Sequence, residues 1–194
     1  MNIAVFASHG GSDLQAIIDA CKSGRLDAQV KVVISNNSKS LALKRAEISG
    51  IPAFHFSQKV ISDSVKLEET ILKTLSDHKI HIIFLAGYLK KLGPSILKAY
   101  ENRVFNIHPS LLPKYGGKGM YGINVHEAVI KAEETETGIT IHRVNDEYDS
   151  GEIVAQRKVP VKSGDTAEIL AARVLEQEHI FIVEVLSEII GGNI

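Results

Sequence analysis

The chain has a single cysteine, Cys21, among its 194 residues. An intrachain disulfide is therefore impossible, and a reducing compartment is the simpler assumption. Cys21 falls on the apolar face of a predicted helix, where a thiol far more often packs than reacts. We therefore expect a cytoplasmic protein in which Cys21 carries no chemistry.

The sequence also lacks a long hydrophobic run and an excess of charge of one sign. No apolar stretch approaches the roughly 20 residues of a membrane-spanning helix, and the N-terminus has no basic segment of the kind that opens a secretion signal. Lys plus Arg number 22 against 23 Asp plus Glu, without a basic cluster, whereas binding nucleic-acid phosphates usually needs a basic face. We expect neither a membrane nor a nucleic acid as partner. The oligomeric state stays open between monomer and homodimer.

Short apolar runs alternate with helical patterns such as Leu41–Ile48. The strands predicted in the first half are 2–7, 30–34, 53–56, 80–85 and 104–107. In the second half, strands are predicted over Ile139–Val144 and Ile153–Val159 and a long helix over Thr166–Ile190. Strand–helix alternation implies parallel pairing, so we predict one α/β domain with a doubly wound, mostly parallel sheet. Ligands are expected beyond the carboxyl ends of its strands.

The loop Ser8–Asp13 follows the first predicted strand and opens a helix. Its glycines and the free N–H groups of a helix start favour a phosphate, although a tight turn is an equally good explanation. Ser12 and Gln15 have the spacing of a capping box at this helix start. Binding of NAD is the weaker reading, because the loop has no G-x-G-x-x-G pattern and the second strand ends without an acidic residue.

A polar pair at the end of a strand gives a sharper signal. Asn106 and His108 are two residues apart on a predicted strand and so share a face, and Pro109 ends the pairing there. Asp149 lies in a polar turn; near His108 it would raise the pKa of the imidazole and favour a cationic donor for acyl transfer. The alternatives are a structural Asn–His pair and a solvated turn residue.

Two other features are open to more than one reading. His108, His126 and His142 match no metal-ligand spacing, so we predict no metal site. The glycine-rich stretch between Lys114 and Gly122 is expected to be either a lid over an anionic ligand, with Lys114 closing on the site, or a flexible connector.

Taken together, these motifs resemble the 10-formyltetrahydrofolate-dependent phosphoribosylglycinamide formyltransferases of purine (IMP) synthesis. The resemblance spans almost the whole chain, and its NIHPSLLPK segment is highly specific for the formyltransferase fold. The segments that carry it are SHGGSDLQAI (8–17), LAGY (85–88), NIHPSLLPK (106–114), DEYDSG (146–151) and RVLEQEH (173–179).

The resemblance implies roles for individual residues and for the two halves of the chain. Residues 1–194 would be one formyltransferase domain, with a Rossmann-like, ribonucleotide-binding half over about 1–100 and a catalytic, folate-binding half over about 101–194. The catalytic residues implied are Asn106, His108 and Asp149. The residues implied to bind the ribonucleotide are Gly11, Ser12, Asp13 and Glu178, with Asp13 standing where the family usually has Asn. The residues implied to line the folate pocket are Leu89, Lys90, Lys91 and Leu92, then Asn145, Asp146, Glu147, Tyr148 and Asp149, together with Asn106.

The implied reaction moves the formyl group of 10-formyltetrahydrofolate, a co-substrate, to the amine of glycinamide ribonucleotide, without a metal. Asn106 and a cationic His108 would donate to the developing oxyanion, while Asp149 would keep His108 charged and relay protons. The alternatives are a formyltetrahydrofolate hydrolase, in which water replaces the amine, and a non-catalytic folate- or nucleotide-binding module. A transfer RNA formyltransferase is disfavoured, because it would need a further domain and a basic surface.

Overall fold

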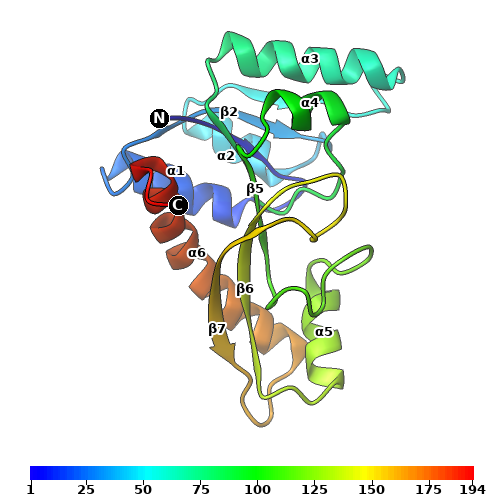
Figure 1. Ribbon diagram of the computed structural model, residues 1–194, viewed down its shortest axis with the longest axis vertical. Helices are drawn as coiled ribbons and strands as arrows, with labels where there is room; N and C mark the ends of the chain where they lie inside the picture. The colour runs from blue at the N-terminus through cyan, green and yellow to red at the C-terminus, as the bar shows by residue number, and fades with distance from the viewer.

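The computed structural model describes all residues 1–194 and contains seven strands and six helices in alternating order along most of the chain (Figure 1). The strands are β1 Asn2–Phe6, β2 Gln29–Ser35, β3 Ala53–His55, β4 Ile82–Leu85, β5 Val104–His108, β6 Glu136–Arg143 and β7 Ile153–Pro160. The helices are α1 Ser12–Lys22, α2 Leu41–Ile48, α3 Ser64–Asp77, α4 Pro94–Ala99, α5 Ile123–Lys131 and α6 Ala167–Gly191. All the predicted strands and helices are present, with boundaries shifted by a few residues. The short helix α4 was not predicted.

One seven-stranded sheet runs through the molecule in the order β3-β2-β1-β4-β5-β6-β7. The pairs from β3 to β5 are parallel, whereas β5–β6 and β6–β7 are antiparallel. The predicted doubly wound, mostly parallel sheet is thus confirmed. The strand order reverses direction between β1 and β4, and in open α/β sheets ligands bind at the carboxyl ends of the strands at such a point.

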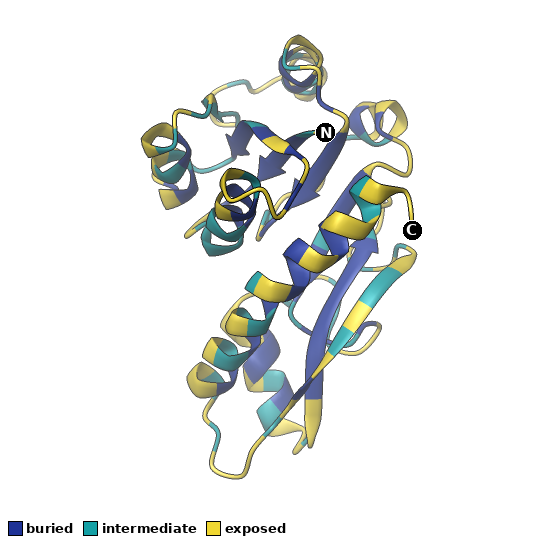
Figure 2. Cartoon of the chain, turned by 90° about the vertical axis from the view of Figure 1, so that its left-hand side faces the viewer, coloured by how far each residue is buried: buried dark blue, intermediate teal, exposed yellow.

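Helices cover both faces of this sheet, as the two-residue period of the strands requires. In β1, Ile3 and Val5 belong to the larger core cluster, while Ala4 and Phe6 belong to a smaller cluster on the opposite face. The larger core includes residues of α1, α2, α5 and α6, and the smaller one includes residues of α3 and α4. Figure 2 shows α6 lying along the sheet, with buried residues alternating with exposed ones. None of the helices combines the length and the apolar character needed to cross a bilayer.

The start of α6 is fixed by local polar contacts. Thr166 caps the helix, since its side chain accepts a hydrogen bond from Ile169 N. Just before it, Asp165 accepts two hydrogen bonds from the guanidinium of Arg173, at 2.5 and 2.7 Å, and a third from Lys162 N. The hydrogen bond from Arg173, supported by that from Lys162, lowers the pKa of Asp165 from its ordinary value of 3.8 to about 2.

We expect Asp165→Asn to lower the Tm at pH 7 by roughly 2–4 °C. The folded-state pKa is depressed, so the stability contributed by the ionised Asp165 is fully present above pH 3.8 and is lost as the pH falls through about 2. The gap in Tm between wild type and variant should therefore close over this window in thermal melts followed by circular dichroism. Asp77→Asn removes only an exposed ion pair with Lys73 and should leave the Tm almost unchanged. A gap that stays constant down to pH 2 would contradict this account of Asp165.

Candidate active site

A cavity of about 340 Å³ lies where the carboxyl ends of β4 and β5 meet the start of α1. The polar and charged side chains predicted to act together all line it: Asp13, Asn106, His108, Asp149 and Glu178. They come from four different parts of the chain: α1, β5, which supplies both Asn106 and His108, the β6–β7 loop and α6. The structure therefore brings these five side chains together at one cavity.

His108 is buried at the end of β5, with 4% of its surface exposed. Its Nε2–H donates a hydrogen bond to the Tyr115 carbonyl at 2.8 Å, because a carbonyl can only accept. Its Nδ1 lies 3.6 Å from Asp149 Oδ2, too far for a hydrogen bond. The neutral ring therefore carries its proton on Nε2 and leaves the lone pair of Nδ1 beside the carboxylate.

The expected cationic state of His108 was wrong for the free protein. Burial lowers the pKa of His108 below its ordinary value of 6.5, and this effect outweighs the opposing influences of Asp149 and the Tyr115 carbonyl. The imidazole is therefore neutral at pH 7. The sequence suggested that Asp149 lies near His108 but could not indicate how deeply the imidazole is buried.

Asp149 is held in the turn between β6 and β7 by its backbone and by a loop from another part of the chain. Its φ of 53° lies in the left-handed region, and its Oδ2 accepts a hydrogen bond from Gly117 N at 2.8 Å. Burial opposes the ionisation of Asp149, but the imidazoles of His142 and His108 and the N–H of Gly117 outweigh it and hold the pKa of this carboxyl below its ordinary value. Asp149 is therefore ionised at neutral pH.

Gly151, two residues after Asp149, must be a glycine because the backbone of Arg143 approaches it closely. A Cβ at this position would lie 1.7 Å from the carbonyl oxygen of Arg143. Any other residue would force the β6–β7 turn apart and move Asp149 with it.

The orientation of Asn106 depends on a residue that the sequence did not identify, His142. His142 Nδ1–H donates to the Arg143 carbonyl at 2.8 Å, so its Nε2 accepts a hydrogen bond from Asn106 Nδ2 at 3.0 Å. This fixes the amide flip of Asn106 and leaves its second N–H available for a ligand. Asn106 and His142 are directly opposite in the β5–β6 ladder. Only this register could have revealed that His142 faces Asn106, and the residue pattern of a single strand does not give the register.

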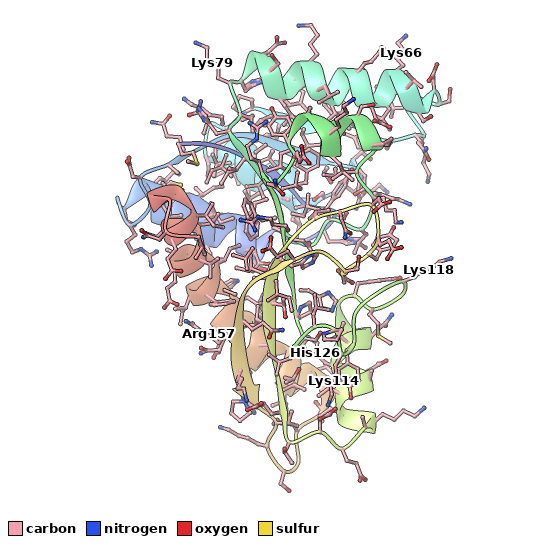
Figure 3. The ribbon with its side chains drawn as sticks, in the orientation of Figure 1. Lys66, Lys79, Lys114, Lys118, His126 and Arg157 are labelled. Carbon is pink, nitrogen blue, oxygen red and sulfur yellow. The ribbon has the colours of Figure 1, made fainter.

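The glycine-rich loop before α5 supports the site with its backbone. The Tyr115 carbonyl contacts His108 and Gly117 N contacts Asp149, while Lys118 lines the cavity. Lys114 was expected to close over the site but instead pairs with Glu134 at 2.7 Å. Figure 3 shows Lys118 projecting outward from the loop.

The start of α1 differs from the predicted capping box. Gly11 is the N-cap residue with φ 69°, and no side chain caps the helix. Glycine is needed at position 11 because a Cβ there would lie 2.8 Å from the Cβ of Ala42. Asp13 and Glu178 line the cavity, whereas Gly11 and Ser12 are not among its wall residues.

The two segments predicted to line a folate pocket meet each other. Lys91 Nζ donates to the Asp146 carbonyl at 2.6 Å and lies 4.9 Å from the centre of the Tyr148 ring. Of the nine positions in these segments, only Leu89, Tyr148 and Asp149 line the 340 Å³ cavity. Lys90, Lys91 and Leu92 line a neighbouring cavity of about 910 Å³, to which Leu89 also contributes. The exposed residues Asn145, Asp146 and Glu147 line neither of these two cavities.

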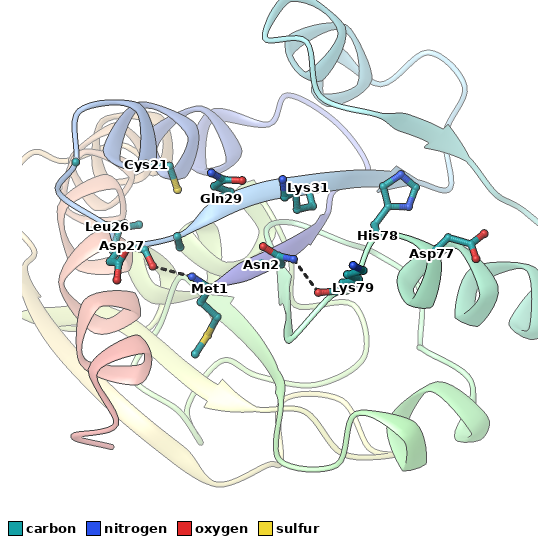
Figure 4. A pocket seen from close by; sticks show the side chains of 12 residues that line it. Met1, Asn2, Cys21, Leu26, Asp27, Gln29, Lys31, Asp77, His78 and Lys79 are labelled. Carbon is teal, nitrogen blue, oxygen red and sulfur yellow. Dashed lines mark hydrogen bonds between the residues drawn. The ribbon is translucent and has the colours of Figure 1, made fainter.

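A third cavity, of about 810 Å³, lies at the opposite, amino ends of β1 and β2. Its side chains, among them Cys21, Lys31 and His78, are spread over an open surface and do not converge on one point (Figure 4). Cys21 also packs against the larger core, and burial raises the pKa of its thiol, which keeps it protonated. No three His, Cys, Asp or Glu side chains in the structure are grouped so as to hold a metal ion.

Comparison with known proteins places this geometry among formyl transferases. The family model described as formyl transferase matches residues 1–186. A phosphoribosylglycinamide formyltransferase from Haemophilus influenzae is 41% identical over 177 residues, which cover 91% of this chain and 81% of that protein. A chloroplastic phosphoribosylglycinamide formyltransferase from Vigna unguiculata is 44% identical over 184 residues, covering 95% of this chain. The chain spans 59% of the length of this plant relative.

Solved structures of similar proteins superpose on this chain over nearly its whole length. Glycinamide ribonucleotide transformylase 1 from Symbiobacterium toebii has a TM-score of 0.91 and 33% identity, covering 99% of this chain and 88% of that one. A formyltetrahydrofolate deformylase from Pseudomonas syringae shares the fold with a TM-score of 0.85, but its identity is 24% and only 61% of that chain is covered.

Proposed function

The chain belongs to the phosphoribosylglycinamide formyltransferase family, and from this premise we propose that it transfers the formyl group of 10-formyltetrahydrofolate to the amine of glycinamide ribonucleotide. The products are formylglycinamide ribonucleotide and tetrahydrofolate. The observation that carries the proposal is the convergence of Asn106, His108 and Asp149 on one cavity, with a free amide N–H and a free imidazole lone pair among them. We propose that these three residues are catalytic.

The first chemical step is attack of the amine nitrogen on the formyl carbon. The attacking nitrogen must lose a proton, and Nδ1 of the neutral His108 is free to accept it. The imidazolium so formed lies next to the ionised Asp149, 3.6 Å away, which stabilises the new positive charge. Asp149 thus acts on the charge that appears during the reaction and does not keep His108 charged beforehand.

The second requirement is stabilisation of the oxyanion of the tetrahedral intermediate. Asn106 offers its second amide N–H to this oxygen, since the first is engaged with His142 Nε2. When the intermediate collapses, the C–N bond to folate breaks and the folate nitrogen takes up a proton, which His108 holds. Proton and electron counts balance, because the amine loses the proton that the leaving nitrogen gains.

We also propose a division of the ligands between the two halves of the chain. The start of α1, at Gly11, Ser12 and Asp13, would bind the ribonucleotide together with Glu178 from α6. The segments 89–92 and 145–149 would enclose the folate, and the contact of Lys91 with Asp146 and Tyr148 would open to admit it. The single cysteine supports a cytoplasmic location as part of this proposal.

The test is to follow the release of tetrahydrofolate spectroscopically from 10-formyltetrahydrofolate, with and without glycinamide ribonucleotide. We expect release only when the ribonucleotide is present. Release that does not depend on the ribonucleotide would instead assign the chain as a hydrolase. No release under either condition would leave a non-catalytic binding module and overturn the proposal.

His142 is expected to act by positioning Asn106. In the variant His142→Asn, kcat should fall by about tenfold while the KM values stay close to wild type, since the oxyanion donor remains but loses its fixed orientation. Deleting the donor itself with Asn106→Ala should cost ~10²–10³. Steady-state kinetics on both variants checks the order of the two effects, with His78→Asn as a control on the half-buried histidine that follows α3. A loss in His142→Asn larger than in Asn106→Ala would contradict the positioning role.

A further inference from the structure

Two carboxyl groups meet at one end of the reaction cavity, and neither of them pairs with a Lys or an Arg. Asp13 is the second residue of α1, and Glu178 lies on α6, which packs against α1; both line the cavity. Glu178 is 8% exposed, and Asp13 Oδ1 is buried without a hydrogen-bond partner. Unpartnered buried carboxyl groups are costly, so this arrangement calls for an explanation in terms of a ligand.

The charged groups around Asp13 do not neutralise it. His179, next to Glu178, places Nε2 3.6 Å from Asp13 Oδ1, beyond hydrogen-bond distance, and this nitrogen also lacks a partner. Arg45 of α2 donates to the Gly10 carbonyl and to Gln15. The other ionisable side chains of the cavity are His108, Asp149 and Lys118, together with the tyrosines Tyr88, Tyr121 and Tyr148. No Lys or Arg forms an ion pair with either Asp13 or Glu178.

The same end of α1 is where the proposed function requires the phosphate of the ribonucleotide. The first N–H groups of a helix have no partner within it, and together with the helix dipole they attract an anion. In the free protein Asp13 is the acidic residue of this first turn, but no side chain caps the helix. A bound phosphate and an ionised Asp13 would be two like charges sharing one small, poorly solvated region.

We propose that Asp13 takes up a proton when the phosphate of the acceptor binds at the start of α1, and that the neutral carboxyl group then donates a hydrogen bond to a phosphate oxygen. The step consumes one proton from solution, converts the carboxylate to a carboxylic acid, and makes or breaks no other bond. Asp13 is thereby a specificity-determining residue that couples ligand binding to pH. The inference rests on the proposed function, since it takes its ligand from there.

The pKa values of the pair support this coupling. Burial raises the pKa of Asp13 to about 6, partly offset by His179, and burial together with the charge of Asp13 raises the pKa of Glu178 well above its ordinary value. Below pH 6 the free protein already holds the required proton, whereas above pH 6 the ligand must recruit it. Affinity for the phosphate is therefore expected to fall by up to about tenfold per pH unit above pH 6.

The experiment is calorimetric titration of the whole protein with ribose 5-phosphate between pH 6.5 and 8.0. Repeating each titration in two buffers of different ionisation enthalpy gives the number of protons taken up on binding. At pH 8.0 the wild type should take up about one proton more than Asp13→Asn, and the variant should bind about tenfold or more tightly than the wild type. The ionisation of the phosphate itself is common to both proteins and cancels. Asp19→Asn, an exposed carboxylate on the same helix, should behave as the wild type.

Equal proton uptake by wild type and Asp13→Asn would overturn the inference, as would failure of the wild type to bind ribose 5-phosphate at pH 6.5. The titration needs no turnover and no folate. A failure of formyl transfer and a failure of proton-linked binding are therefore seen in separate measurements.

Discussion

Replacing His108 by Ala is expected to lower kcat by about 10³, because the variant loses the group that takes the proton from the attacking amine and returns it to the leaving nitrogen. Nδ1 of His108 has a free lone pair beside an ionised carboxylate, and water in the vacated space has no such partner fixed in place. Steady-state kinetics with glycinamide ribonucleotide measures the loss. The fold should survive, since His108 lies at the end of β5 and its ring makes a single hydrogen bond within the chain.

His126 provides the matched control. It is as buried as His108, at 5% against 4% exposed, but lies on α5 and does not line the reaction cavity. His126→Ala should lower the Tm yet keep kcat near wild type. If both variants lose activity in proportion to their loss of Tm, His108 has only a structural role.

The pH dependence of kcat in the wild type tests whether His108 is neutral before the reaction. Because burial lowers the pKa of His108 below 6.5, the neutral form persists from pH 7 down to below 6.5. The midpoint of the acid limb of kcat should therefore lie below pH 6.5, as Nδ1 becomes protonated before the amine attacks. A profile whose acid limb lies above pH 6.5 would indicate that the cationic ring predicted from sequence is the ground state after all.

The sequence predicted those parts of the site that depend on local pattern. The two-residue period of β5 put Asn106 and His108 on one face, and the long helix predicted over Thr166–Ile190 agrees with α6 to within one residue at each end. The polar turn had made Asp149 a candidate, but only the resemblance to a family gave Asp149 and Glu178 their roles, since no local rule could bring the β6–β7 loop and α6 to β5.

What the sequence missed depends on distances and burial between distant segments. The role of His142 follows from the β5–β6 register, and the wrong charge state of His108 follows from burial that no pattern measures. Lys114 was misplaced because its partner Glu134 lies 20 residues away along the chain. The capping box failed for a similar reason: Gly11 is packed against Ala42 of α2, and this tertiary contact fixes the helix start.

Replacing Asp149 by Asn should lower kcat by about 10² and, in addition, displace the acid limb of the pH profile to lower pH. The amide can still accept the hydrogen bond from Gly117 N, so the loop keeps its support, but the negative charge beside His108 is lost. That charge raises the pKa of His108 against the effect of burial, so its removal lowers the pKa further. The imidazolium formed during the reaction becomes less stable, which slows proton transfer, while the ground-state ring stays neutral to a lower pH.

These two effects of Asp149→Asn separate an electrostatic role from a structural one. A variant that only distorted the β6–β7 loop would lose activity at every pH and keep the midpoint of the acid limb where the wild type has it. The charge account requires kcat to fall and the midpoint to move together. Asp77→Asn removes an exposed carboxylate of α3 and should change neither quantity. If Asp149→Asn lost kcat while the midpoint of the acid limb stayed at the wild-type pH, Asp149 would have no electrostatic role in the reaction. It would then only support the β6–β7 loop.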